Sequence, residues 1–448
     1  MAPPIRQFPQ QKQIVLSLAV LLLLGLAPSL PAQTTVREDG RLRIPVPPGG
    51  SPPVLECLAT VGPAIPVTAL AFSPDGKLLA SAAGRDVAIW DLPSAKLLKR
   101  AAAGPADATV HALAFSKDGR WLAIGEGKPC GWGAVRLVDV QSNQTAATST
   151  EPKDVVYGLA FSPDGSLLAA GSADGKAYVW NVSEKKLVGT IHQHTDWVLG
   201  VAFSPDGKLL ATASTDRSIQ VWEVGTWKPL NRLVQGDPVQ AVAFNPDGQL
   251  LSWAVAGPQD RMVRWRPPLD PPEETPKPGA EKKPRVIPEI RNIDTSGNTP
   301  LALAWGSVPQ GNPPQPRMLV ACAEKTVKVY DINGGLRAVL AGHGDWVYAA
   351  AVSSDGKTFA SGSADGTVRL WQGVENRPLA TLVQLAPGKD DWLIVASPGY
   401  FATSSPGAVH WDKKALSTPP EKLAELLGKP ELVRDALAGK AVNAPPLK

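Results

Sequence analysis

The stretch that decides the fold is residues 198–223, which read VLGVAFSPDGKLLATASTDRSIQVWE. Its first six residues alternate with a period of two, and the pair Asp206-Gly207 follows closely. The run LLATAS comes next, then a turn at Thr215 and Asp216, and then SIQVW. A period of two is typical of a half-buried strand, and Asp-Gly pairs favour tight turns between antiparallel strands. The stretch therefore predicts three short antiparallel strands.

The same pattern recurs along most of the chain, each time as an apolar alternation, an Asp-Gly turn, a small-residue strand and a strand that closes on a large side chain. The turns are Asp75-Gly76, Asp118-Gly119, Asp164-Gly165, Asp206-Gly207, Asp247-Gly248 and Asp355-Gly356. The first five are 43, 46, 42 and 41 residues apart, and the last gap of 108 residues leaves room for one more repeat. That repeat is visible, without its Asp-Gly turn, at Leu301 to Asp331. The closing side chains are Trp90, Leu137, Trp180, Trp222, Trp265, Tyr330 and Trp371.

A period of this length with a Trp-Asp ending resembles the WD40 family, whose repeats are about 40 to 45 residues long with four strands per propeller blade. The resemblance covers roughly residues 55 to 385. It implies an all-β fold, a WD40-type β-propeller, because one four-stranded sheet cannot bury both of its faces until neighbouring sheets stack and close into a ring.

The number of blades depends on two segments that look like outer strands, Leu55 to Val61 and Arg377 to Gln384. Two surplus outer strands imply an eighth set of inner strands. The segment Trp392 to Asp412 can supply it, since Trp411 lies 40 residues after Trp371. We therefore expect eight blades within residues 55–415. Seven blades remain the alternative, because Pro398 is not followed by the Asp of the repeat.

Composition narrows the class of protein. With 44% hydrophobic and 19% charged residues, the chain is expected to be a packed globular protein. Lys and Arg number 45 and Asp and Glu 41, a net charge of +4, which is too weakly basic to predict nucleic-acid binding. The three cysteines, Cys57, Cys130 and Cys322, lack the spacing of a zinc or redox motif, and their redox state stays open. We expect no cofactor and no metal.

Residues 1–32 predict a signal peptide. Arg6 and Lys12 precede the apolar run Ile14 to Ala27, and small residues with Pro31 follow up to Ala32. The run has 14 residues, fewer than the ~20 that span a bilayer. We expect an exported bacterial protein, periplasmic or extracellular, that is cleaved near Ala32 and then has no membrane span; retention as an N-terminal anchor is the alternative. A Pro-rich linker is expected at residues 33–54.

Three further segments stand out. Residues 267–284 are Pro-rich and charged, which predicts a loop insertion between the third and fourth strands of blade five, and residues 308–317 predict a second insertion in blade six, on the same side of the disc. Residues 416–439 predict a helical appendage with two short helices, the first from Pro420 to Leu427 and the second from Pro430 to Ala438, each ended by Gly. The tail at residues 440–448 is expected to be disordered.

Two repeats offer Ser, His and Asp together, but a catalytic role is not the interpretation we favour. The residues are His194, Ser214, Asp216 and Trp222 in the fourth repeat and His343, Ser363, Asp365 and Trp371 in the seventh. Recurrence in two blades argues against chemistry. The WD40 resemblance implies a buried hydrogen-bond chain in which Trp supplies an N–H donor. Thr212 and Ser361 are alternative hydroxyl members, since they share a strand face with Ser214 and Ser363.

The resemblance also implies a rigid scaffold that binds other proteins or peptides on the face where the first strands begin. Counting nine residues back from the Asp of each Asp-Gly pair places Trp197 and Trp346 there, and counting seven back adds four more side chains: His111, Tyr157, Leu199 and Tyr348. We predict a non-catalytic binding scaffold of the cell envelope with these six residues at its partner-binding rim. The alternatives are a periplasmic propeller enzyme and a carbohydrate-binding propeller that stacks sugars on the two Trp rings.

Overall fold

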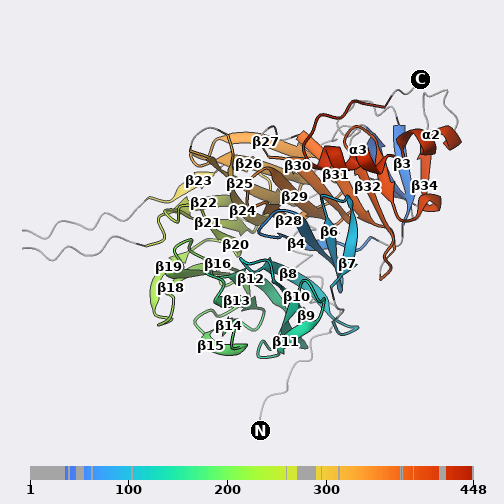
Figure 1. Cartoon of the computed structure of the whole chain (residues 1–448). Coiled ribbons are helices and arrows are strands. Elements are labelled where there is room, and N and C mark those ends of the chain that lie inside the picture. The colour runs from blue at the N-terminus through green and yellow to red at the C-terminus, as the bar shows by residue number, and fades with distance from the viewer. Residues whose placement is uncertain are drawn as a thin grey trace, which may run out of the picture.

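The computed structural model describes residues 36–38, 41–46, 55–61, 64–101, 104–258, 260–269, 289–293, 295–310, 313–373, 375, 377–386, 388–412 and 420–445. The described strands form eight antiparallel sheets, most of them built from consecutive strands (Figure 1). Eight sheets and the all-β class confirm those parts of the prediction. The predicted signal peptide lies outside the described residues.

Seven of the sheets follow one another along the chain, and we call them blades one to seven. Blade one is β4 (Val67–Phe72), β5 (Leu78–Ala83), β6 (Asp86–Asp91) and β7 (Lys96–Arg100). Blade two is β8 (Thr109–Phe115), β9 (Trp121–Lys128), β10 (Trp132–Asp139) and β11 (Thr145–Ser149). Blade three is β12 (Val156–Phe161), β13 (Leu167–Ser172), β14 (Ala177–Asn181) and β15 (Lys186–Ile191). Blade four is β16 (Val198–Phe203), β17 (Leu209–Ser214), β18 (Ser218–Glu223) and β19 (Pro229–Val234).

The remaining blades depart slightly from this plan. Blade five is β20 (Val239–Phe244), β21 (Leu251–Ala256), β22 (Arg261–Arg266) and a short β23 (Arg291–Ile293). Blade six is β24 (Pro300–Val308), β25 (Gln315–Cys322), β26 (Thr326–Asp331) and β27 (Leu336–Ala341). Blade seven is β28 (Val347–Val352), β29 (Thr358–Ser363), β30 (Thr367–Gln372) and β31 (Arg377–Gln384), extended by β32 (Trp392–Ala396) and β33 (Phe401–Thr403). Most of the insertion predicted at residues 267–284, between β22 and β23, lies outside the described residues. The insertion predicted at residues 308–317 is shorter than expected, because Val308 ends β24 and pairs with Gln315 of β25.

The ring closes through the first strands of the seven blades. These strands contact one another in the order β4, β8, β12, β16, β20, β24 and β28, and β28 contacts β4 again. Figure 1 shows them around the centre of the molecule. Glycine allows this approach, because a Cβ on Gly158 would lie 2.9 Å from the carbonyl oxygen of Leu199 in the next blade. Seven blades therefore surround the axis.

The eighth sheet lies outside this ring. It consists of β1 (Val36–Glu38), β2 (Arg41–Val46), β3 (Leu55–Thr60) and β34 (Val409–Asp412) in that order. The expectation that it would be a blade of the ring is wrong, because β28 and β4 already contact each other and leave no place between them. Trp392 to Asp412 is also divided: β32 and β33 extend blade seven and β34 pairs with β3. The linker predicted at residues 33–54 contains two strands of this sheet.

One apolar cluster joins the eighth sheet to the ring. It contains Ile44 of β2, Cys57 of β3 and Trp411 of β34 together with Trp90 of blade one and Leu370 of blade seven, all of them buried. The first three described strands and the last one, β34, thus meet in a peripheral sheet that packs on the two blades where the ring closes. Burial of apolar surface is the main source of stability for such a contact.

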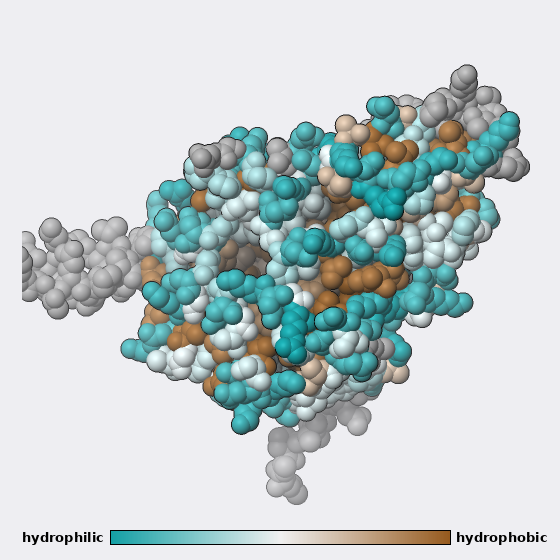
Figure 2. Space-filling model, viewed as in Figure 1, coloured by the Kyte–Doolittle hydropathy of each residue, from teal (hydrophilic) through white to brown (hydrophobic). Residues whose placement is uncertain are grey.

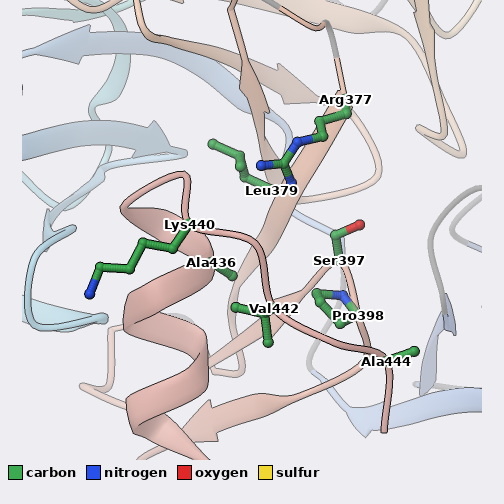
Figure 3. Close-up of a pocket in the computed structure, with 8 residues that line it drawn as sticks. All are labelled: Arg377, Leu379, Ser397, Pro398, Ala436, Lys440, Val442 and Ala444. Carbon is green, nitrogen blue, oxygen red and sulfur yellow. The ribbon is translucent and has the colours of Figure 1, made fainter.

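The predicted helices are confirmed as α2 (Pro420–Leu427) and α3 (Pro430–Leu437), and both bury one apolar face. α3 contacts β31, β32 and β33, and α2 contacts β34. Residues 440–445 differ from the expected disorder, because Val442 packs on the apolar cluster. With Leu379 and Ala436, Val442 lines a shallow pocket between the tail, α3 and β31 (Figure 3). Neither helix has the length and apolar character needed to cross a membrane.

Candidate functional site

Blades four and seven each contain a buried chain of four polar side chains. In blade four the Nδ1 of His194 lies 2.9 Å from Asp216 Oδ2 and its Nε2 lies 2.7 Å from Thr212 Oγ1. The indole N–H of Trp222 donates to the same Thr212 oxygen over 3.1 Å. Every donor in the chain thus has an acceptor when the imidazole is neutral and carries its proton on Nδ1.

Blade seven repeats this geometry with a different hydroxyl. His343 lies 3.2 Å from Asp365 Oδ2 and 2.8 Å from Ser361 Oγ, which also accepts the indole N–H of Trp371 over 3.0 Å. Thr212 and Ser361 are therefore the hydroxyl members. Ser214 and Ser363 instead donate to the carbonyls of Asp196 and Asp345.

The surroundings of these chains suit a structural role. The side chains of His194 and Asp216 are 1% and 2% exposed, and Thr212 is fully buried, so substrate has no path to the hydroxyl. Burial alone would raise the pKa of Asp365, but hydrogen bonds and the charge of His343 lower that pKa to about 2. Burial lowers the pKa of His343 despite the neighbouring carboxylate. Each of these hydrogen-bond chains therefore contains a carboxylate that accepts hydrogen bonds from several donors. Such a network favours a single arrangement of the blade.

A different set of residues lies at the start of the first strands, and the structure shows why these side chains are presented. In every blade of the ring the first strand carries a β-bulge, in which two of its residues face one residue of the second strand. The extra residues are half-buried, although most of their neighbours in the strand are buried. They are Thr68, His111, Tyr157, Leu199, Gln240, Leu301 and Tyr348.

This bulge ring contains four of the six predicted rim residues, and Trp197 and Trp346 lie directly before two of the bulged strands. Sequence reasoning missed Thr68, Gln240 and Leu301. The same count of seven residues before an Asp-Gly pair would have found the first two, whereas blade six lacks that pair. A bulge turns a side chain away from the regular pleat, so one register supplies seven side chains around the channel mouth.

The bulge residues of neighbouring blades reach one another. Thr68 of blade one donates to the carbonyl of Val110 in blade two over 2.6 Å. The ring of His111 lies 4.9 Å from that of Tyr157 in blade three, and Tyr157 stacks on Trp197 of blade four at 5.8 Å between centroids. We call these last three side chains the aromatic row. All three are half-buried, so each keeps part of its surface in solvent.

A second aromatic group lies in blade seven, where Trp346 meets Tyr348 edge to face at 6.2 Å. By the order of the blades this pair lies across the channel from the aromatic row. The structure therefore divides the aromatic side chains of the predicted rim into two groups. Leu199, the bulge residue of blade four, follows Trp197 by two positions in the sequence. Figure 2 shows a hollow near the middle of the disc with hydrophobic side chains inside and hydrophilic residues around it.

Carboxylates accompany both groups. Asp196 is exposed and accepts the backbone N–H of Trp197 over 2.9 Å, and Asp345 is exposed and accepts that of Trp346 over 2.8 Å. Burial and the nearby charge of Asp154 raise the pKa of Tyr157 to about 12. Burial lowers the pKa of His111 to about 4, so its ring is neutral at pH 7.

Metal and thiol chemistry find little support at this rim. Across the described part of the chain, no three His, Cys, Asp or Glu side chains are grouped to hold a metal ion. Cys57 and Cys322 are buried, and burial raises the pKa of each thiol to about 12. Cys130 is exposed and lies in the turn between β9 and β10.

Comparison with known proteins agrees with this architecture. The family model "WD domain, G-beta repeat" matches residues 55–91, 144–181, 185–223 and 334–372. Each match begins with an outer strand and continues with three strands of the next blade, and the first match assigns β3 the place of the closing strand that β31 occupies in blade seven. The chain therefore contains WD40 repeats, and they form a WD40-type β-propeller.

Relatives match over short stretches. The chain is 42% identical to the small ribosomal subunit protein RACK1y of Oryza sativa subsp. japonica over 72 residues, 16% of this chain and 21% of that protein. It is 46% identical to the intraflagellar transport protein 122 homologs of Danio rerio and Homo sapiens over 59 residues, 13% of this chain and 5% of each of those proteins. A chain of the crystal structure of the mitotic checkpoint complex superposes with a TM-score of 0.58 at 19% identity, over 78% of this chain and 99% of that one, which shows the shared fold.

Proposed function

We propose that this protein is a non-catalytic scaffold that binds a protein or peptide partner across its bulge ring and the two aromatic groups beside it. The observation that carries the proposal is the bulge at one register of all seven first strands, which presents half-buried side chains that differ from blade to blade around the channel mouth. A rigid ring of varied, partly apolar side chains is suited to binding an extended surface.

Two further points support a binding role. WD40 propellers generally act as protein-interaction scaffolds, and the polar residues that resemble catalytic groups are buried and paired within blades four and seven. Aromatic side chains are the residues that most often dominate the energy of an interface, and Tyr and Trp do so at low cost in conformational entropy. The partly exposed rings of Trp197 and Trp346 are thus the strongest candidates for anchor residues.

The test is site-specific photo-crosslinking in the cells that make the protein. A crosslinking amino acid at position 197 or 346 should form adducts with a protein partner, and the same residue at position 208, an exposed Lys in the Asp-Gly turn on the opposite side of blade four, should not. Trp197→Ala should weaken capture at least tenfold, a loss of about 1.4 kcal/mol or more. Equal adducts at position 208, or full capture by Trp197→Ala, would contradict the proposal.

A glycan array tests the alternative that the propeller binds a carbohydrate. A carbohydrate-binding propeller would use the exposed ring faces as platforms for sugars, and binding of glycans that Trp197→Ala abolishes would replace a protein partner with a sugar. Stacking of Tyr157 against Trp197 at an interplanar angle of 19° already covers one of these faces, which favours the protein interpretation.

We also propose export to the periplasm or the cell exterior, on the order of charge, apolar run and small residues within residues 1–32. Mass analysis of the mature protein should show an N-terminus near residue 33. A mature chain that retains Met1 would show that the segment is not removed.

A further inference from the structure

The aromatic row is accompanied by more negative than positive charge. Asp196 adjoins Trp197, and Asp154 lies two residues before β12, which carries Tyr157. Both carboxylates accept backbone N–H groups through Oδ1, Asp196 from Trp197 and Asp154 from Val155, which holds them at the rim. Among the described residues, neither carboxylate forms a salt bridge with a Lys or Arg side chain.

Two cations of the neighbouring loops have other contacts. Lys128 lies 3.4 Å from Asp107, and the ammonium of Lys153 donates to the carbonyl of Thr150. Because the pKa of His111 is lowered to about 4, the histidine of the row adds no positive charge at neutral pH. The row therefore combines partly exposed aromatic rings with carboxylates at both of its loop ends.

We propose that the aromatic row takes an arginine or lysine side chain of the partner, with the cation against the face of Trp197 that Tyr157 does not cover and its charge balanced by Asp154 and Asp196. This rests on the proposed binding function and names the chemistry of the residue that is recognised. The pair Trp346 and Tyr348 across the channel would contact another part of the same partner.

Charge complementarity selects this occupant. The face of an aromatic ring is the negative end of its quadrupole and attracts a cation, most strongly for Trp. Carboxylates beside the rings add attraction for a cation and oppose an acidic side chain. A neutral apolar side chain could fill the same space, but it would have no electrostatic attraction to the carboxylates.

The experiment compares two probes on the full chain. The acetylated, amidated tripeptide Gly-Arg-Gly carries the cation, and Gly-citrulline-Gly has nearly the same shape without the charge. The readout is the indole N–H resonance of Trp197 in a ¹⁵N-labelled protein, assigned with Trp197→Phe. The arginine peptide should shift this resonance in a saturable way, and citrulline should require at least a threefold higher concentration for the same shift.

Matched variants assign the effect to the row. Asp196→Asn keeps the oxygen that accepts the backbone N–H of Trp197, so it should weaken arginine binding at least threefold without altering the fold. Asp345→Asn, the equivalent change beside Trp346, should leave the Trp197 shift unchanged. Equal responses to arginine and citrulline, or an Asp196→Asn variant that binds arginine as tightly as the wild type, would overturn the inference.

Failure of this inference and failure of the proposed function give different results. Crosslinking of a partner at position 197 without any preference for arginine over citrulline would contradict the cation site and support the scaffold function. Arginine binding at the row without partner adducts at position 197 would keep the cation site and remove the scaffold role.

Discussion

Histidine and tryptophan occur in two regions of this molecule with opposite surroundings. In blades four and seven, His194 and His343 are buried, and each is part of a hydrogen-bond chain that ends on a Trp indole. At the channel mouth, His111 and Trp197 are half-buried and meet through Tyr157. The residue types are the same, but the register within the blade decides whether they complete the interior or face the solvent.

The comparison separates what repeats from what varies. The buried chains keep His, a hydroxyl, Asp and Trp at matching positions of two blades, as expected for groups that must satisfy one another. The bulge register holds a different side chain in most blades, although the backbone there is the same in all seven. Folding requires the same side chains at the positions of the buried hydrogen-bond chains. Recognition of a partner requires side chains that vary at the bulge positions.

The largest expected effect is on the buried Trp of blade four. Trp222→Ala should lower the free energy of unfolding by about 3–5 kcal/mol, because it leaves a cavity in the apolar cluster and removes the donor to Thr212. Urea denaturation followed by circular dichroism measures this loss. Trp371→Ala in blade seven should behave alike, and a loss below about 1 kcal/mol in either variant would contradict the structural role.

The second prediction concerns the carboxylate of blade seven and its dependence on pH. Asp365→Ala should cost about 1–3 kcal/mol at pH 7, because it leaves the backbone N–H groups of Gly344 and Thr367 and the ring of His343 without their acceptor. The pKa of Asp365 is lowered to about 2 in the folded state, below its value in the unfolded chain. The stability it contributes is therefore complete above about pH 4 and is lost as the pH falls toward 2.

The difference in unfolding free energy between wild type and Asp365→Ala should consequently shrink between pH 7 and pH 3. Denaturation midpoints at pH 7, 5 and 3 measure it. Burial also lowers the pKa of His343, so its neutral form contributes less stability, in wild type and variant, as the pH falls below its unfolded value near 6.5. Asp345→Ala, an exposed carboxylate, is the control. A difference independent of pH would show that the charge of Asp365 contributes little.

The repeat made much of this arrangement predictable from sequence. Fixed spacing places the strands, the buried chains and the rim, because each Asp-Gly turn sets the register of its blade. The choice between Thr212 and Ser214 needed the structure, since both lie on one strand face and the distance to His194 decides. The bulges were also missed, because a single extra residue leaves no mark in the alternation.

The position of the eighth sheet could not be predicted in the same way. Counting outer strands shows that a further sheet exists. However, β3 and β31 have similar sequence patterns, and it is β31, the strand that follows β30 in the chain, that pairs as the fourth strand of blade seven. A local signal did exist for β2, where Leu42 and Ile44 are buried and alternate with Arg41 and Arg43. Because prolines surround β2 in the sequence, the segment was predicted to be a linker.

The smallest effect on stability is expected at the rim, where it sharpens the comparison most. Trp197→Ala should lower the free energy of unfolding by no more than about 1 kcal/mol, because the ring is half-exposed and loses one stacking contact with Tyr157. The same denaturation series as for Trp222→Ala measures it, and Trp346→Ala serves as the second rim variant. Partner capture by the Trp197 variant should nevertheless fall at least tenfold. If Trp197→Ala destabilises the protein as much as Trp222→Ala, the aromatic row belongs to the interior of the ring, and the opposite side of the disc, between β22 and β23 and between β24 and β25, becomes the surface to probe.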